Sequence, residues 1–403
     1  MARIDRDIVE DMHRCRHDLH AHPEIAYAEI RTAALVAKEL TACGLEVHQG
    51  LAGTGVVATL SRGAGPRIGL RADMDALAIM EATELPYRSV VPGVMHACGH
   101  DGHTAMLLGA ARQLSRARDL AGVVHFIFQP AEENEGGALR MLEQGLLERF
   151  PCDAIYAMHN WPGLPAGQFA VNRGAMMAAF DTFEIEIRGS GTHAAMPEMG
   201  CDPFIPVAQI LLALQTIPSR RLNPQDAAVI SVTQVHGGDT WNVIPEIVTL
   251  RGAVRCLSET VRDAVERDVK SVVTAIAAAH GATARIDYAR RYPVTINTAR
   301  EAEFAATIAA AMETAMPVQI DGRASMASED FGFLLQKAPG AYLWLGAADD
   351  RHNMPLHSPF YDFNDELLEI GARYWVRLIE QALSRSTPEC DDGVRPTVAE
   401  PAS

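Results

Sequence analysis

Short apolar runs alternate with amphipathic helical segments along the first 160 residues. Apolar positions three or four residues apart predict helices over 7–24, 31–44 and 103–117. Apolar runs of strand length lie at 56–60, 67–73, 123–129 and 154–160. Because strands that are separated by helices usually pair in parallel, this order predicts a mainly parallel sheet with helices on both faces.

The hydrophobic pattern changes at residue 181. Phe183, Ile185 and Ile187 alternate with polar residues, which is typical of a strand with one buried face. Four further elements follow: a helix over 203–217, strands over 227–235 and 248–256, and a helix over 258–281. An alternating strand over 282–292 ends this part. The order β-α-β-β-α-β predicts a ferredoxin-like domain.

The two patterns together predict an α/β protein in which one domain is inserted into another. We expect the catalytic domain to span 1–180 and 291–385, with the ferredoxin-like insertion at 181–290. A helix over 300–315, a strand over 341–347 and a helix over 364–385 complete the chain, and the strand should return to the first sheet. The polar, proline-bearing tail 386–403 is predicted to be disordered.

Charge and cysteine content narrow the class of protein. With 35 basic and 51 acidic residues the net charge is −16, which argues against nucleic acid or an anionic membrane as a partner. A small anionic substrate stays possible, since one pocket can be basic within an acidic protein. The seven cysteines are scattered, so we expect a reducing, cytoplasmic location. Neither an apolar run of membrane-spanning length nor a secretory signal is recognisable.

Acids and imidazoles follow the ends of several predicted strands. Asp75 follows the strand over 67–73, Glu132 and Glu133 follow 123–129, and His159 ends 154–160. The carboxyl ends of parallel strands meet at one edge of a sheet, where ligands bind in α/β folds. His357 and the segment MHACGHDGHT, which precedes the helix over 103–117, can reach the same edge. We therefore predict a metal site there.

The residue types narrow the metal. Histidine, cysteine and carboxylate together suit zinc, manganese, cobalt or nickel, whereas calcium and magnesium prefer oxygen ligands. More ligands are available than one tetrahedral ion needs, which favours a pair of ions about 3.5–4 Å apart. Of two adjacent glutamates, one can bind metal while the other transfers a proton.

Five motifs carry a family resemblance. ADMDA, MHACGHDGHT, FQPAEE, GTHAA and NVIP occur in this order between roughly residues 10 and 385. They resemble the metallo-amidohydrolases of the aminoacylase and carboxypeptidase G type, most closely the hippurate hydrolase and auxin-conjugate amidohydrolase branch. The resemblance implies a zinc-peptidase-like α/β domain with an inserted ferredoxin-like lid that forms a dimer contact.

The resemblance also implies the metal ligands. They are Cys98, His100, Glu133, His159 and His357. Many relatives have a histidine ligand where this chain has Asp73, and Cys98 is expected to supply the replacement. Asp101 is expected to orient one ligand, while His96 and His103 are expected to be structural.

Catalytic and substrate-binding roles follow from the same resemblance. Glu132 matches the general base that later protonates the leaving amine, and Asp75 matches the acid that orients a ligand or the base. His193 matches a lid histidine that reaches into the site of a neighbouring subunit. Asn242 and Arg255 match polar lid residues near the carboxylate of the substrate.

The leading hypothesis is hydrolysis of the amide bond of N-acyl amino acids, such as hippurate or N-acetyl amino acids, by a metal-activated water. The expected assembly is a homodimer or higher homo-oligomer formed through the lid domain. One alternative is a cysteine hydrolase in which His100 or His103 activates Cys98. Another is a metal-binding or amino-acid-binding protein without catalysis.

Overall fold

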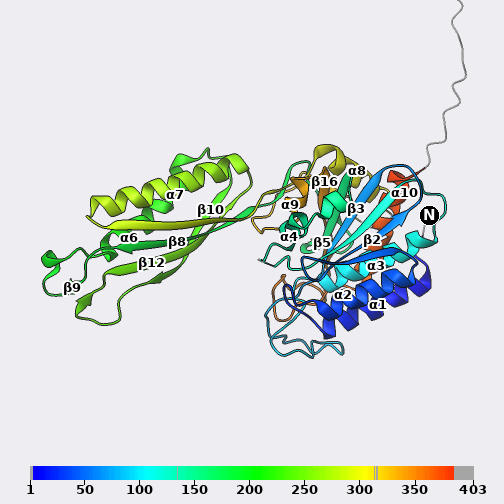
Figure 1. The fold of residues 1–403 in the computed structure, drawn as a ribbon, viewed down its shortest axis with the longest axis horizontal. Coiled ribbons are helices and arrows are strands. Elements are labelled where there is room, and N and C mark those ends of the chain that lie inside the picture. The colour runs from blue at the N-terminus through cyan, green and yellow to red at the C-terminus, as the bar shows by residue number, and fades with distance from the viewer. Residues whose placement is uncertain (1–2, 134, 313, 315, 385–403) are drawn as a thin grey trace, which may run out of the picture.

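The protein consists of a larger and a smaller body joined by extended strands (Figure 1). This computed structural model describes residues 3–133, 135–312, 314 and 316–384, so the tail 386–403 lies outside the described residues. The larger body holds an 8-stranded sheet and the smaller body a 4-stranded sheet.

The larger sheet confirms the predicted α/β class. Its order is β1 (Glu46–Leu51), β2 (Gly55–Ser61), β4 (Val123–Gln129), β3 (Arg67–Asp73), β5 (Ala154–Pro165), β16 (Gly340–Ala348), β6 (Phe169–Val171) and β15 (Gln319–Ile320). Strands β4, β3, β5 and β16 are parallel, and antiparallel pairings lie outside this centre. As predicted, the strand near residue 341 returns to the first sheet, beside β5.

Apolar side chains on both faces explain why the central strands are buried. On β4, Phe126 and Phe128 belong to the main hydrophobic cluster, whereas Ile127 belongs to a second cluster on the opposite face. The main cluster contains residues of α1 (Arg6–Ala21), α2 (Ile30–Ala42), α3 (His100–Arg116), α8 (Ala299–Ala310) and α10 (Glu366–Ala382). The second contains residues of α4 (Gly137–Glu143), α5 (Leu146–Arg149) and α9 (Gly332–Leu335). This double cover is typical of a sheet with a parallel centre.

The smaller body has its own hydrophobic core. Its elements are β8 (Ala179–Arg188), α6 (Phe204–Leu214), β10 (Ala228–His236), β12 (Ile247–Cys256), α7 (Glu259–Ala279) and β13 (Thr283–Tyr292). The strands form an antiparallel sheet in the order β10-β12-β8-β13. Phe183, Ile185 and Ile187 of β8 point into this core, which explains the alternating pattern of the sequence.

Several short elements complete the structure. Strands β7 (Ala175–Met177) and β14 (Thr295–Ile296) pair where the chain passes between the two bodies. Strands β9 (Thr192–His193) and β11 (Val243–Ile244) pair at the end of the smaller body that lies farthest from the larger one (Figure 1). Among the described helices, none is both long and apolar enough to cross a membrane.

Candidate metal centre

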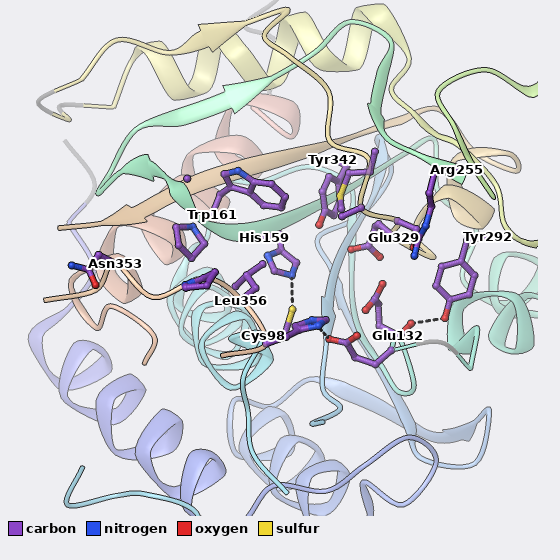
Figure 2. A pocket seen from close by; sticks show the side chains of 18 residues that line it. Cys98, Glu132, His159, Trp161, Arg255, Tyr292, Glu329, Tyr342, Asn353 and Leu356 are labelled. Atoms are coloured by element: carbon purple, nitrogen blue, oxygen red, sulfur yellow. Dashed lines mark hydrogen bonds and ion pairs between the residues drawn. The ribbon is translucent and has the colours of Figure 1, made fainter. Parts of the chain in front are cut away.

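Strands and the loops beside them line an open cavity of about 690 Å³. Cys98, Glu132, Glu133, His159 and His357 line it, together with Arg255 from β12 of the smaller body. Figure 2 shows His159 and Cys98 in the middle, Trp161 and Leu356 on one side, and Arg255 and Tyr292 on the other. The cavity therefore brings together side chains from both bodies.

Two histidines present the same ring nitrogen to the centre. His100 donates its Nδ1 proton to the carbonyl oxygen of Asp75 at 2.9 Å, and its Nε2 is buried without a hydrogen bond to any described residue. His159 donates its Nδ1 proton to the carbonyl oxygen of Asn160 at 2.6 Å, and its Nε2 lies 3.5 Å from the Cys98 sulfur. A histidine held through one nitrogen in this way offers the lone pair of the other to a metal.

Glu133 is shared by two groups of ligand atoms. Its Oε1 lies 3.2 Å from His357 Nε2, and its backbone N–H donates to Asp75 Oδ2 at 2.9 Å. Ligand atoms of Cys98, Glu133 and His357 lie within 4.8 Å of one another, and so do those of His100, Glu132 and Glu133. Two adjacent cation positions that share one carboxylate fit this donor set.

The electrostatics of the centre also fit a cation. Burial raises the pKa of the Cys98 thiol well above its usual range, and the carboxylates of Glu133 and Glu132 raise it further. Burial alone would lower the pKa of His100, yet Asp73 and Asp75 outweigh it and raise the pKa to about 10. Both shifts show that the centre favours added positive charge, which a divalent ion would supply.

Glu132 lies in a buried pocket of carboxylates beside these ligands. Burial raises its pKa well above the usual range, and Glu329 and Glu133 add to the effect. Tyr292 donates its hydroxyl proton to the backbone carbonyl of Glu132 at 2.5 Å, which fixes the loop. Ala131, directly before it, has a φ of 56°, a strained conformation for a residue with a side chain.

Asp73 does not offer a free ligand atom. Its Oδ2 accepts a hydrogen bond from Arg71 Nη1 at 2.7 Å, and its Oδ1 lies 2.6 Å from Nδ1 of His103. The other nitrogen of His103 accepts the backbone N–H of Asn160 at 3.0 Å. Both nitrogens of His103 are therefore used within the protein, as expected for a structural histidine.

The expectation for Asp101 is wrong. Its Oδ2 lies 2.9 Å from Nδ1 of His20 and 3.2 Å from Nε of Arg16, both of which are on α1. The side chain points away from the ligands because a buried arginine needs a carboxylate partner. Instead, Asp75 contacts both His100 and Glu133.

Arg255 reaches the cavity, whereas His193 and Asn242 do not. Arg255 donates from Nη1 to the Ser328 hydroxyl at 2.7 Å, and its guanidinium carbon lies 4.1 Å from the centre of the Phe180 ring. Burial lowers its pKa. His193 lies on β9 and Asn242 directly before β11, at the far end of the smaller body (Figure 1). The backbone N–H of Ala194, the residue after His193, donates to the backbone carbonyl of Asn242 at 2.9 Å. His193 and Asn242 therefore lie close together on one surface.

Sequence reasoning missed several residues of the cavity. They are Trp161, Met177, Tyr292, Ser328, Glu329, Tyr342 and Leu356. The ring of Trp161 stacks on that of Trp344 with centroids 4.1 Å apart and makes an aromatic wall. One feature of the sequence could have indicated Trp161: it lies directly after a predicted strand, two residues beyond His159. Ser328 and Glu329 lie in a connection without a recognisable motif.

The geometry does not favour a cysteine nucleophile. The histidine in contact with Cys98 is His159, not His100 or His103. Burial and the nearby carboxylates raise the pKa of the Cys98 thiol, whereas the surroundings of a catalytic cysteine lower it.

Comparisons with known proteins show the family to which the chain belongs. Hippurate hydrolase of Campylobacter jejuni is 39% identical over 373 residues, which cover 92% of this chain and 96% of that protein. N-acetyl-L-cysteine deacetylase of Bacillus subtilis is 40% identical over 363 residues, covering 90% and 85%. The solved structure of a dinuclear metal-binding peptidase of the M20 family from Bacillus subtilis superimposes with a TM-score of 0.81 at 36% identity, covering 93% and 98%. The family model for peptidase family M20/M25/M40 matches residues 69–381, and the chain belongs to this family.

Proposed function

We propose that the protein is a dinuclear metal-dependent amidohydrolase that cleaves N-acyl amino acids into a carboxylic acid and a free amino acid. The observation that carries the proposal is the position of Glu132, a buried carboxylate that forms no ion pair with a described residue. Its carboxylate lies within 4.8 Å of ligand atoms of His100 and Glu133, and Glu133 is shared with Cys98 and His357. The activities named for hippurate hydrolase and N-acetyl-L-cysteine deacetylase support this class of substrate.

The metal ligands in this proposal are those that the sequence indicated. They are Cys98, His100, Glu133, His159 and His357. Two divalent ions bound there would polarise the scissile carbonyl and lower the pKa of a bound water. Zinc, manganese, cobalt and nickel all suit a set of three imidazoles, a thiolate and a carboxylate.

Glu132 moves the proton in this reaction. It accepts a proton from the attacking water and delivers it to the nitrogen of the leaving amine. Its buried position, with a raised pKa, suits a group that must hold a proton between these two steps. Asp75 is a positioning residue, because its carbonyl oxygen orients His100 and its carboxylate holds the backbone of Glu133.

The two ends of the cavity fit the two halves of the substrate. Arg255 supplies a half-buried guanidinium that would pair with the α-carboxylate of the amino acid. On the other side, Trp161 and Leu356 offer apolar surface for the acyl group (Figure 2). An aromatic acyl group such as benzoyl would gain more from this wall than acetyl would.

A second copy of the chain would complete the site. His193 and Asn242 have no access to the cavity of their own chain, and the surface around them carries exposed apolar side chains, including Trp241, Val243 and Met199. Burial of such a surface favours self-association. We therefore propose a homodimer in which the domain at 181–290 acts as a lid and His193 stabilises the oxyanion in the partner's site.

The six described cysteines form no disulfide, which supports a cytoplasmic location.

Turnover of a panel of N-acyl amino acids tests the proposal. The panel holds N-acetyl and N-benzoyl derivatives, with and without a chelator, and with zinc, manganese, cobalt or nickel added back. Chelator-sensitive release of a free amino acid, restored by metal, is the expected result. If the metal-loaded protein hydrolyses no member of the panel, the proposed substrate class is wrong.

A further inference from the structure

A second group of possible metal ligands lies outside the cavity. His13 and His17 are one turn apart on α1, and Asp365 is the residue directly before α10. Asp365 Oδ2 lies 3.4 Å from His13 Nδ1 and 2.7 Å from His17 Nε2. One ligand atom from each residue lies within 4.8 Å of the others. None of the three residues lines the cavity of the candidate metal centre.

The donor set is that of a transition-metal site. Two histidines four residues apart face the same side of a helix and can bind one ion together. Two imidazoles and one carboxylate suit zinc, cobalt, nickel or copper. Zinc bonds of 2.0–2.1 Å place tetrahedral donor atoms roughly 3.3 Å apart, close to the separation of His13 and Asp365. The shorter contact of His17 is a hydrogen bond, whose proton an ion would displace.

Neighbouring residues hold the His17 ring in place. The Tyr87 ring stacks on it with centroids 3.7 Å apart and an interplanar angle of 13°. Tyr87 in turn donates its hydroxyl proton to Asp362 Oδ2 at 3.0 Å. A ring that is already fixed loses little conformational entropy when it binds an ion.

The surrounding charge is negative. The buried guanidinium of Arg16 pairs with Asp101, Asp362 and Asp365. Asp101 is also paired with His20, so Asp362 and Asp365 share the remaining positive charge of Arg16, and this surplus of carboxylates favours a further cation. The side chains of His13, His17 and Asp365 are 40%, 34% and 26% exposed, so an ion and its water ligands can reach them.

We propose that His13, His17 and Asp365 form an additional divalent metal site, with zinc as a fitting ion. The ion would connect α1 to the start of α10, two helices from opposite ends of the chain that both pack on α3. Because the three ligands come together only in the folded chain, binding should stabilise the fold. This site is independent of the proposed catalytic function.

Zinc content measured by equilibrium dialysis at a fixed micromolar free zinc concentration tests the site. The proteins are the wild type, the double variant His13→Gln/His17→Gln and the control His22→Gln. His22 also lies near a carboxylate, with Nδ1 3.5 Å from Asp18 Oδ1, but it has no second histidine one turn away. We expect the wild type and the control to bind one more zinc per chain than the double variant.

Equal zinc content in the wild type and the double variant would overturn the proposal. Both proteins contain the same candidate metal centre, so the difference in their zinc content does not depend on turnover or on how many ions bind at that centre. Added zinc should also raise the midpoint of thermal unfolding more in the wild type than in the double variant. If the wild type binds the additional zinc but its unfolding midpoint rises no more than that of the double variant, the ion does not connect the two helices. The single variant His17→Gln, in which one histidine remains, should bind zinc at least tenfold more weakly.

Discussion

His100 and Asp75 are joined through the backbone: Nδ1 of His100 donates to the carbonyl oxygen of Asp75 at 2.9 Å. The Asp75 carboxylate has a separate contact, because its Oδ2 accepts the backbone N–H of Glu133 at 2.9 Å. Its Oδ1 also lies 3.3 Å from Nδ1 of His100, so the carboxylate supports both ligands, whereas the carbonyl oxygen contacts the histidine alone.

Asp75→Asn tests the contribution of the carboxylate to the metal site. The carbonyl oxygen stays and keeps His100 in place, whereas the negative charge beside both ligands is lost. We expect metal affinity to fall about 10–100-fold, as for other groups that orient metal ligands. Titration of the metal-free protein with zinc measures the affinity. An unchanged affinity would show that the carboxylate does not support the ligands.

Arg255→Gln should impair binding of substrates that have a free carboxylate. Loss of a charge-assisted hydrogen bond costs about 1.5–3 kcal/mol, which corresponds to a rise in KM of roughly 10–100-fold. A substrate amide that lacks the carboxylate should be turned over equally by wild type and variant. Arg251→Gln, on the same strand but paired with Glu184 at the surface, is the control and should leave KM unchanged. An equal loss with both substrates would contradict the carboxylate role.

Two inactive variants should restore activity when their subunits are exchanged. In a mixed dimer of His193→Ala and Glu132→Gln, one of the two sites has a normal Glu132 and receives the normal His193 from its partner. Statistical mixing should return about a quarter of the wild-type activity. Activity is measured after the variants are mixed under conditions that exchange subunits, and a mixture of His193→Ala with itself is the control. No gain in activity would place His193 outside the partner's site.

His20 should make stability depend on pH. Burial alone would lower its pKa, but hydrogen bonds to Asp101 and Glu81 raise it to about 9, against an unfolded value of 6.5. The folded state therefore binds an extra proton between these values, and its free energy of unfolding falls as pH rises through this window. The contribution is complete below pH 6.5 and is on the order of 3 kcal/mol. Chemical unfolding of wild type and His20→Gln at several pH values tests this, since the variant should lack that slope.

Much of the candidate site in the larger body could be predicted from the sequence, because its reactive residues lie near the ends of strands or of strand pairings. Glu132 and Glu133 follow β4, and His159 lies on β5 just beyond the end of its pairing with β3, so one region of the sheet brings the three residues together. Strands such as β6 and β15 could not be predicted, because two or three residues carry no periodicity.

Ion pairs between residues far apart in the chain also could not be predicted from the sequence. Arg71 interrupts an apolar strand, and its partner Glu329, at 2.9 Å, is 258 residues away. Asp101 looked like a group that orients ligands because it follows His100, but its partner Arg16 comes from another helix. Spacing along one element predicts which face a residue occupies, whereas the element that packs there decides its partners.

Glu132 should transfer a proton and Glu133 should bind metal, and a measurement of metal content distinguishes these two functions. Metal bound per chain and turnover are measured on the same preparations of wild type, Glu132→Gln and Glu133→Gln. We predict that Glu132→Gln keeps the metal content of the wild type and loses turnover by about 10²–10⁴-fold, whereas Glu133→Gln loses metal together with turnover. Full turnover in metal-loaded Glu132→Gln would contradict the account.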